Sequence, residues 1–241
     1  SLLIFAGIVT RLPVVLTQTA SVVEQQQLIN ILLFIVFGVL VVASIVFINE
    51  GRRQIALTYA RRFIAGREAG GGAQTYLPLR VNQAGVIPII FAVSLVLIPS
   101  FAGSYLSQLP SPQLSQIGKF LAANFTTSSI AYNVSYFLLV VGFTFFYTAI
   151  IFNPKKVADE IKKHGGFLPG IRPGTATAEY LNYIMVRVTL AGAAFLGTIA
   201  ILPSIASEIT GVTTLVVGGT GLLIVVSVIL DTAKQFESKL I

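Results

Sequence analysis

Basic side chains gathered in two segments have the clearest chemical potential in this sequence. Six arginines lie between residues 49 and 80, and five basic residues lie between residues 153 and 178. Arg172 stands in a stretch that Pro169 and Pro173 stiffen, because each proline restricts the backbone around it. A guanidinium held in a stiff turn suits a phosphate or carboxylate partner. The alternative is a solvated arginine that contacts nothing.

The sequence contains no recognisable catalytic constellation. No nucleophile, base and orienting group come together in a motif, and no glycine-rich phosphate loop is present. The chain has no cysteine and one histidine, His164, which we expect to be a solvent-exposed loop residue rather than a metal ligand. We therefore expect no enzymatic activity, no metal and no cofactor, so that the energy for any work must come from a partner.

Long apolar runs separate the basic segments. Residues 28–48 and 130–152 are runs of 21 and 23 residues without a charged side chain. At about 1.5 Å per helical residue, each matches the roughly 30 Å hydrocarbon core of a bilayer. The runs are continuous rather than alternating, which favours helices over barrel strands. With 55% hydrophobic residues and a mean hydropathy of +0.86, the sequence predicts an all-α membrane protein.

Six membrane-spanning segments are expected. The first begins in the middle of an apolar run without an initiator methionine, so we expect a truncated helix and a chain that is part of a longer protein. The third contains Pro88, at which it could flex, and the fifth carries Arg187 in its first turns. The expected bounds are about 1–16, 28–48, 81–101, 130–152, 180–205 and 215–230.

The loop charges predict the orientation. Segments 49–80 and 153–178 hold 11 of the 16 basic residues, whereas the opposite connections hold only Lys119. The positive-inside rule therefore places both basic segments and the C-terminal tail in the cytoplasm. The same rule accounts for the net charge of +7 without a nucleic-acid partner. Within the second segment, Asn153 and Pro154 predict a capped short helix that ends at Gly165.

Seven short motifs occur in order along the chain: SLLIFAGIV (1–9), YARR (59–62), LPLRVNQAGVIP (77–88), FYTA (146–149), FNP (152–154), PGIRPG (169–174) and GGTGLLIVV (218–226). Taken together, they resemble the bacterial SecY family of protein-translocase channel subunits. The resemblance covers essentially the whole chain, from the family's fifth to its tenth transmembrane helix, and leaves the first four helices absent.

The resemblance implies a pore in the bacterial cytoplasmic membrane. Such a pore passes unfolded or signal-bearing polypeptides across the membrane and opens sideways to release hydrophobic helices into lipid. It also implies several partners: SecE and SecG-type subunits, the missing N-terminal half, and a SecA motor or ribosome on the basic loops.

Three sets of residues match functional positions of the family. An apolar ring at the narrowest point of a pore excludes water and so opposes ion leakage, yet it makes no sequence-specific contacts with a passing polypeptide. The matching residues are Ile4, Ile8, Ile90 and Ile224 for the pore ring, Asn82, Gln83 and Pro88 for the lateral gate, and Arg52, Arg53, Arg61, Arg62, Arg67, Arg172, Lys155 and Lys156 for ribosome or SecA docking.

Two other classes of protein compete with the channel. Half of a secondary transporter would also use helices broken by glycine and proline. It would need polar or ionisable groups in the middle of its spans, whereas Arg11 and Arg187 lie near helix ends. A purely structural subunit would not need two such elaborate basic segments.

Overall fold

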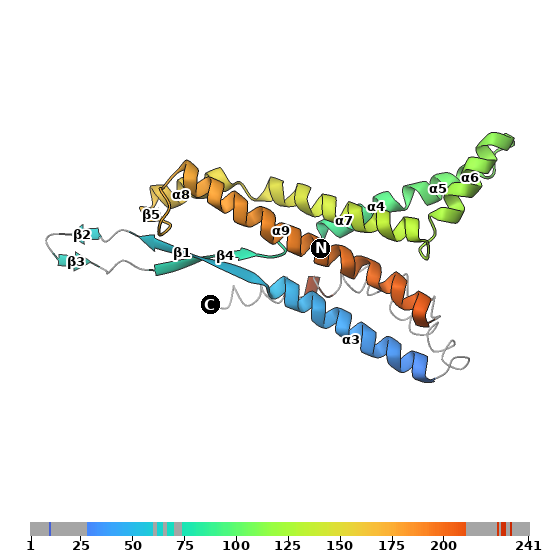
Figure 1. Cartoon of the computed structure of the whole chain (residues 1–241), viewed down its shortest axis with the longest axis horizontal. Coiled ribbons are helices and arrows are strands. Elements are labelled where there is room, and N and C mark those ends of the chain that lie inside the picture. Colours follow the sequence, from blue (N-terminus) through green and yellow to red (C-terminus); the bar gives the residue numbers. More distant parts are fainter. Residues whose placement is uncertain are drawn as a thin grey trace.

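The structure is a computed structural model in which most of the chain is helical. It describes residues 28–59, 62–64, 67–69 and 74–210, together with Thr10, Val226, Val228, Ile229 and Thr232. The elements are α3 (Leu28–Glu50), β1 (Arg52–Tyr59), β2 (Arg62–Ile64), β3 (Arg67–Ala69), β4 (Gln74–Arg80), α4 (Ile87–Val96), α5 (Ile98–Leu106), α6 (Pro112–Asn124), α7 (Ile130–Ile151), α8 (Pro154–Lys163), β5 (Gly166–Phe167) and α9 (Thr175–Thr210) (Figure 1).

Three helical stretches among the described residues are long and apolar enough to cross a membrane. They are Ile87–Leu106, Ile130–Lys163 and Thr175–Ala206, and a shorter apolar helix covers Gly38–Glu50. The helical membrane fold expected from the sequence is therefore confirmed. The first and last expected spans, 1–16 and 215–230, lie almost wholly outside the described residues.

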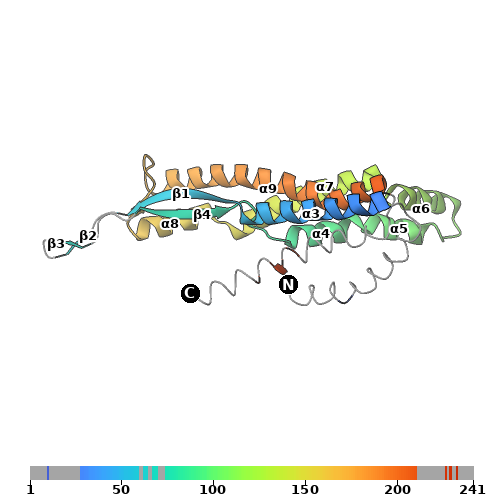
Figure 2. The same cartoon turned by 90° about the horizontal axis from the view of Figure 1, so that it is seen from below.

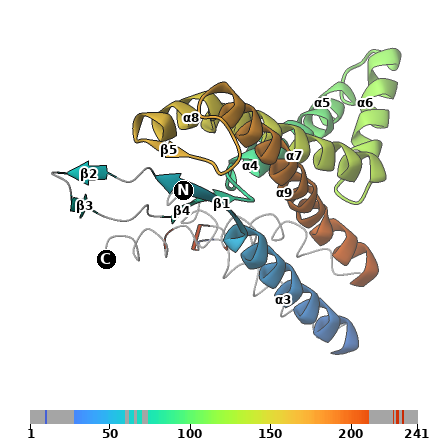
Figure 3. The ribbon, with the colours of Figure 1, turned by 60° about the vertical axis from the view of Figure 1, so that its left-hand side comes forward.

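Helix α7 packs between α4 and α9, and α3 lies against α9 (Figure 3). The buried residues of α7 form a stripe with a spacing of four residues: Tyr132, Tyr136, Val140, Thr144 and Thr148. The other faces of α7 expose large apolar side chains, including Leu138, Phe146 and Ile150. Such a helix buries one stripe in the protein and leaves the rest to lipid, where apolar exposure is favourable.

The third expected span begins later than the sequence suggested. Residues 81–86 are non-helical, and α4 starts at Ile87 with Pro88 in its first turn. Gly85 has a φ of 65°, a left-handed conformation that an α-helix cannot include. Proline is favoured in the first turn of a helix, because the backbone N–H that it lacks would have no partner there. Pro88 is therefore a helix-starting residue rather than a flexing point. The break in this span lies at Leu97, between α4 and α5.

Two further differences concern helix bounds. The fifth expected span begins at Thr175 rather than about 180, so Arg187 lies several turns inside α9 rather than in its first turns. The connection 102–129 contains α6, which was not expected. Helix α6 crosses α5 closely because each helix has a glycine at the crossing. A Cβ on Gly103 would lie 2.6 Å from the backbone nitrogen of Ala122, and a Cβ on Gly118 would overlap the backbone of Ser107.

The two basic segments fold together into one unit, seen from below in Figure 2. Strand β1 pairs antiparallel with β4 on one side and with β5 on the other, giving the order β4–β1–β5. Because β4 belongs to the first basic segment and β5 to the second, β1 joins the two. Neither segment was expected to contain strands. We call β1, β4, β5, α8 and the first turns of α9 the two-loop platform.

Candidate docking platform and gate segment

A second hydrophobic core, separate from the membrane bundle, holds the two-loop platform together. It is made of side chains from β1, β4, α8 and the first turns of α9, together with Leu168. Ile55 and Leu57 point inward from β1, alternating with exposed neighbours as a half-buried strand requires. They meet Ile161 of α8 and Leu181 of α9, which is fully buried. The basic side chains therefore stand on a packed scaffold rather than on loose loops.

The predicted docking residues lie on different elements of this platform. Arg52 and Arg53 are exposed on β1, and Arg80 lies opposite Arg52 across the hairpin. Lys155 and Lys156 are exposed in the first turn of α8. The remaining arginines of the first segment divide by position: Arg62 lies in β2, Arg67 lies in β3, and Arg61 lies outside the described residues.

Helix α8 begins as the sequence predicts. The side-chain oxygen of Asn153 accepts a hydrogen bond from the backbone N–H of Lys156 at 3.2 Å, and Pro154 occupies the first helical turn. This cap satisfies one of the four N–H groups that a helix start leaves without a partner. It also fixes the direction in which the helix leaves α7.

The Arg172 side chain is exposed, and hydrogen bonds to backbone carbonyl oxygens fix the turn before and after it. The hydroxyl of Thr177 donates to the carbonyl oxygen of Arg172 at 2.9 Å, and the backbone N–H of Ile171 donates to the carbonyl oxygen of Leu168 at 3.1 Å. Gly170 and Gly174 have φ angles of 80° and 110°, which L side chains rarely adopt. The turn is thus fixed by its own backbone, and the guanidinium itself makes no hydrogen bond within the described residues.

Asn82 and Gln83 lie in the non-helical segment before α4, whereas Pro88 lies in the first turn of α4. The side-chain amide of Asn82 donates to the side-chain oxygen of Asn49 at 2.9 Å, linking this segment to the end of α3. The Asn82 amide oxygen is buried without a hydrogen-bond partner among the described residues. Gln83 donates to the Met185 sulfur at 3.7 Å, a weak bond to α9.

A close backbone approach fixes the position of this segment against α9. A Cβ on Gly192 would lie 2.6 Å from the carbonyl oxygen of Val81, so only glycine fits there. The backbone N–H of Val81 also donates to the carbonyl oxygen of Gly51 at 2.9 Å. Val81, the residue before Asn82, is therefore held between α9 and the end of α3.

Of the four predicted pore-ring isoleucines, the structure describes one. Ile90 lies in α4, half-buried, and packs against the core that α4 shares with α7 and α9. Ile4, Ile8 and Ile224 lie outside the described residues, so the convergence of the ring stays a prediction.

Sequence reasoning missed two contributors to these sites. Asn49 is a polar residue at the end of an apolar run, and that position was a usable signal for a hydrogen-bonding role. The alternation of apolar and polar residues around Ile55 and Leu57 is typical of a strand, although the segment is short and rich in arginine. No group of three or more metal-binding side chains occurs in the part of the chain that the structure describes.

Comparison with known proteins decides the family. A model of the SecY family matches residues 1–233. The chain belongs to the SecY family. Its SecY relatives include the "Protein translocase subunit SecY" of Mycobacterium tuberculosis, 43% identical over all of this chain and 55% of that protein, and that of Streptomyces scabiei, 44% identical over all of this chain and 54% of that protein. The SecY of Chlamydia trachomatis is 47% identical over 89% of this chain and 46% of its own length.

Solved SecY-type structures share the fold. One, described as "The plug domain of the SecY protein stablizes the closed state of the translocation channel and maintains a membrane seal", matches with a TM-score of 0.61, 19% identity, and coverage of 100% of this chain and 59% of that one. Another, "The structure of a protein conducting channel", matches with a TM-score of 0.51, 17% identity, and coverage of 86% and 49%. The chain thus spans about half the length of the SecY proteins it resembles.

Proposed function

We propose that this chain forms the C-terminal half of a protein-conducting channel of the bacterial cytoplasmic membrane. The observation that carries the proposal is the SecY family match over residues 1–233. The missing half of the same protein supplies the rest of the pore wall. The complete channel passes unfolded polypeptides across the membrane and releases hydrophobic helices into lipid, together with SecE and SecG-type subunits.

The pore waist is an apolar ring of Ile4, Ile8, Ile90 and Ile224. Aliphatic side chains suit this role because they exclude water and ions when the pore is empty, yet make no specific hydrogen bonds to a passing chain. The placement of Ile90 supports it: the residue is half-buried on a helix start that Pro88 and the Val81–Gly192 contact hold in place.

The lateral gate uses Asn82 and Gln83. The buried, unpartnered amide oxygen of Asn82 supports this role, since an unsatisfied acceptor at membrane depth favours a donor from the missing half. Such a bond between membrane helices is worth about 1 kcal/mol. A hydrophobic signal segment can offset that by partitioning into lipid.

The two-loop platform is the docking surface for the SecA motor or the ribosome. Its exposed basic residues come from both segments, and the positive-inside rule places them in the cytoplasm. One packed core joins β1, which follows α3 in the chain, to the first turns of α9, so a partner bound at Arg172 or Arg52 contacts a single folded unit. The channel has no catalytic site of its own, and this partner supplies the energy.

Photocrosslinking tests the channel proposal against the transporter. A photoreactive residue at Ile90 or Ile224 in the full-length protein is expected to label a polypeptide stalled in transit, because both positions line the pore. The matched control is Ile150, which is exposed on α7 and does not belong to the predicted pore ring. If Ile90 and Ile224 label no more than Ile150, the channel proposal fails and the transporter or scaffold interpretation gains.

A further inference from the structure

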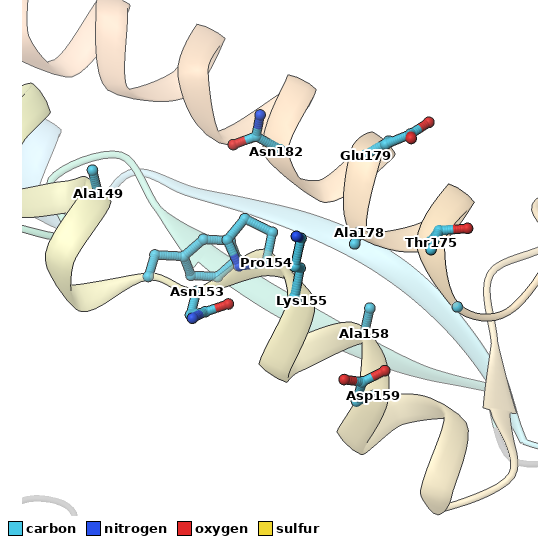
Figure 4. A pocket seen from close by; sticks show the side chains of 12 residues that line it. Ala149, Asn153, Pro154, Lys155, Ala158, Asp159, Thr175, Ala178, Glu179 and Asn182 are labelled. Atoms are coloured by element: carbon cyan, nitrogen blue, oxygen red, sulfur yellow. The ribbon is translucent and has the colours of Figure 1, made fainter.

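The two ends of the molecule expose different kinds of surface. The two-loop platform carries a cleft of about 690 Å³ between α8 and the first turns of α9 (Figure 4). Its carboxylates, Asp159 and Glu179, are both exposed, and Glu179 points away from α8, so they do not converge on one ligand. Helix α6, at the opposite end (Figure 1), instead sorts its exposed side chains into two distinct flanks.

One face of α6 is fixed against α5. The backbone of Gly118 lies directly against that of Leu106 and Ser107, with no side chain between the two helices at this point. The hydroxyl of Ser115 donates to the carbonyl oxygen of Ser107 at 3.3 Å, which adds a hydrogen bond at the same crossing. Because α6 cannot rotate about its own axis without losing these contacts, the directions of its other side chains are fixed as well.

The remaining side chains of α6 form an apolar flank and a polar flank on either side of Gly118. A helix turns by about 100° per residue, so positions three or four apart lie on the same side. Ile117 and Phe120 are 52% and 66% exposed on one flank, whereas Gln116 and Lys119 are exposed on the other. Gln113 and Asn124, at the two ends of the helix, are the polar residues beside the apolar flank. The apolar flank is Leu114, Ile117, Phe120 and Leu121, and the polar flank is Ser115, Gln116, Lys119 and Ala123.

The neighbours of α6 place it at the membrane surface opposite the two-loop platform. The span Ile87–Leu106 has 20 residues, which at about 1.5 Å per residue match the hydrocarbon core, and Gly118 lies against its last turn. Tyr105, 71% exposed in that turn, is of a residue type that favours the membrane–water interface. The next span begins at Ile130, soon after α6 ends. The middle of α6 therefore lies where the hydrocarbon meets the headgroups.

Helix α6 also has the length and direction of a helix that lies on a membrane. With 13 residues, it is too short to cross the hydrocarbon core. Figures 1 and 3 show it running across the direction of α9 rather than along it. With α5 beside it, such a helix turns one flank toward the acyl chains and the other toward water.

The two flanks match the two layers of a lipid leaflet. Large apolar side chains gain free energy among acyl chains, and the long side chain of Lys119, which carries the only charge on α6, can reach a headgroup phosphate. We propose that α6 is an interfacial helix whose apolar flank lies in the leaflet opposite the two-loop platform, with Lys119 at the lipid phosphates. Because α6 is fixed to the end of the span that carries Ile90, it anchors that span at the membrane surface.

Spin labelling tests this proposal, which goes beyond the channel function and does not depend on it. The full-length protein with its partner subunits is placed in vesicles of phosphatidylethanolamine and phosphatidylglycerol. Ile117→Cys and Gln116→Cys, each carrying a nitroxide, are a matched pair because the two exposed residues adjoin in sequence but lie on opposite flanks. We expect the Ile117 label to be accessible to oxygen and about 5–10 Å deep in the leaflet, and the Gln116 label to be accessible to a water-soluble nickel chelate.

Three results overturn the proposal. Equal access of both labels to the nickel chelate would mean that α6 stands in water. Access of both labels to oxygen alone would mean that α6 lies wholly within hydrocarbon. An immobile Ile117 label that neither reagent reaches would mean that a protein segment, rather than lipid, covers the apolar flank. A channel with normal translocation would be compatible with any of these results, so they are distinct from a failure of the channel proposal.

Substitutions on the two flanks test the anchoring separately. Ile117→Asp and Gln116→Asp place the same short charged group on the same helix, and both positions are exposed, so α6 is expected to keep its fold. Ile117→Asp should move a label at Phe120 toward water by several ångströms, because a carboxylate in the acyl layer is unfavourable. Gln116→Asp should leave the depth of that label unchanged. An equal shift in both variants, or a shift in neither, contradicts the proposal.

Discussion

Arg172 and Asn82 show two opposite ways in which this fold holds a polar side chain. The backbone of Arg172 is fixed by the Thr177 hydroxyl, while its guanidinium is left exposed. Asn82 is half-buried, with one side of its amide bonded to Asn49 and the other side unpartnered within the described residues. The first arrangement suits a large partner that arrives from solvent. The second suits a contact that must break within the membrane.

Arg172→Glu is expected to weaken ribosome or SecA binding by about tenfold or more, because a charge-assisted hydrogen bond is lost and a repulsion is added. Membrane insertion of the protein should be unchanged, since the turn is held by the carbonyl oxygen of Arg172 rather than by its side chain. Vesicle flotation with ribosomes or SecA measures the binding, and protease protection measures the insertion.

Arg172→Lys serves as the control for that variant. It keeps the positive charge but loses the planar set of donors of the guanidinium. We therefore expect an affinity for the ribosome or SecA that lies between those of the wild type and Arg172→Glu. Equal losses of binding and insertion in Arg172→Glu would indicate a folding defect instead of a docking contact.

Asn82→Ala is expected to make the gate open more readily. It removes a bond worth about 1 kcal/mol, so precursors with weakened, less hydrophobic signal segments should be translocated several-fold better. The rate of translocation into inverted vesicles measures this. Gln83→Ala is expected to have a smaller effect, because the bond from Gln83 to the Met185 sulfur is weaker. If both variants behave alike, Asn82 has no special part in the gate.

At the scale of elements, close approaches at glycine decide how the helices and the non-helical residues 81–86 fit together. Gly192 has the Val81 carbonyl oxygen against it, whereas Gly142, in the middle of α7, has open space around its Cβ position. The two positions are otherwise alike, since both lie inside apolar membrane helices. They form a natural pair for comparing a packed with an unpacked glycine.

Gly192→Ala is expected to destabilise the protein by about 1–3 kcal/mol, because the new methyl group meets backbone that must move. Gly142→Ala should be neutral or slightly stabilising, since alanine is the better helix former by about 0.5–1 kcal/mol. Thermal unfolding of the full-length protein in detergent separates the two cases. Equal melting temperatures would mean that the Val81 segment yields without cost.

The elements differ in how far the sequence could predict them. The uncharged runs were enough for α3 and α7, whose observed bounds Leu28–Glu50 and Ile130–Ile151 lie close to the expected ones, because membrane helices depend on length and hydropathy alone. The Asn153–Pro154 signal likewise predicted the start of α8. Strand β5 has two residues and exists only because β1 lies beside it. Contacts between distant segments leave no local signal of this kind.

The functional sites also combine features that the sequence predicts with contacts that it does not. The arginines were identified by residue type, whereas the Asn82–Asn49 bond joins residues 33 positions apart and needs the three-dimensional structure.

For the whole molecule, the basic charge gathers on one packed platform at one end of the helices (Figure 1). If the partner is ribosomal RNA, each phosphate contact releases counterions, and the binding constant falls steeply as salt rises. A protein partner such as SecA would give a weaker dependence on salt, because its carboxylates carry no condensed counterions.

The variant Arg52→Gln with Arg53→Gln is expected to lower the salt slope of ribosome binding by about 1.4–1.8, corresponding to two lost phosphate contacts. Binding is measured by co-sedimentation over a series of potassium chloride concentrations. Arg187→Gln is the control, because the Arg187 guanidinium lies 4.0 Å from the ring centre of Tyr183 on α9 and outside the docking set. An equal change in slope for both variants would mean that only the total charge matters.

Residues 1–241 alone are expected not to conduct. This chain spans about 55% of its SecY relatives, so under the half-channel proposal the remaining pore wall comes from other helices, and the apolar ring is not expected to close around a polypeptide without them. In planar bilayers the purified chain should give no polypeptide-sized conductance, while co-expression with a second chain carrying the preceding helices should restore both conductance and translocation. The second chain alone is the matched control. Polypeptide-sized conductance from residues 1–241 by themselves would mean that these helices form a pore by self-association, and the half-channel proposal would then be wrong.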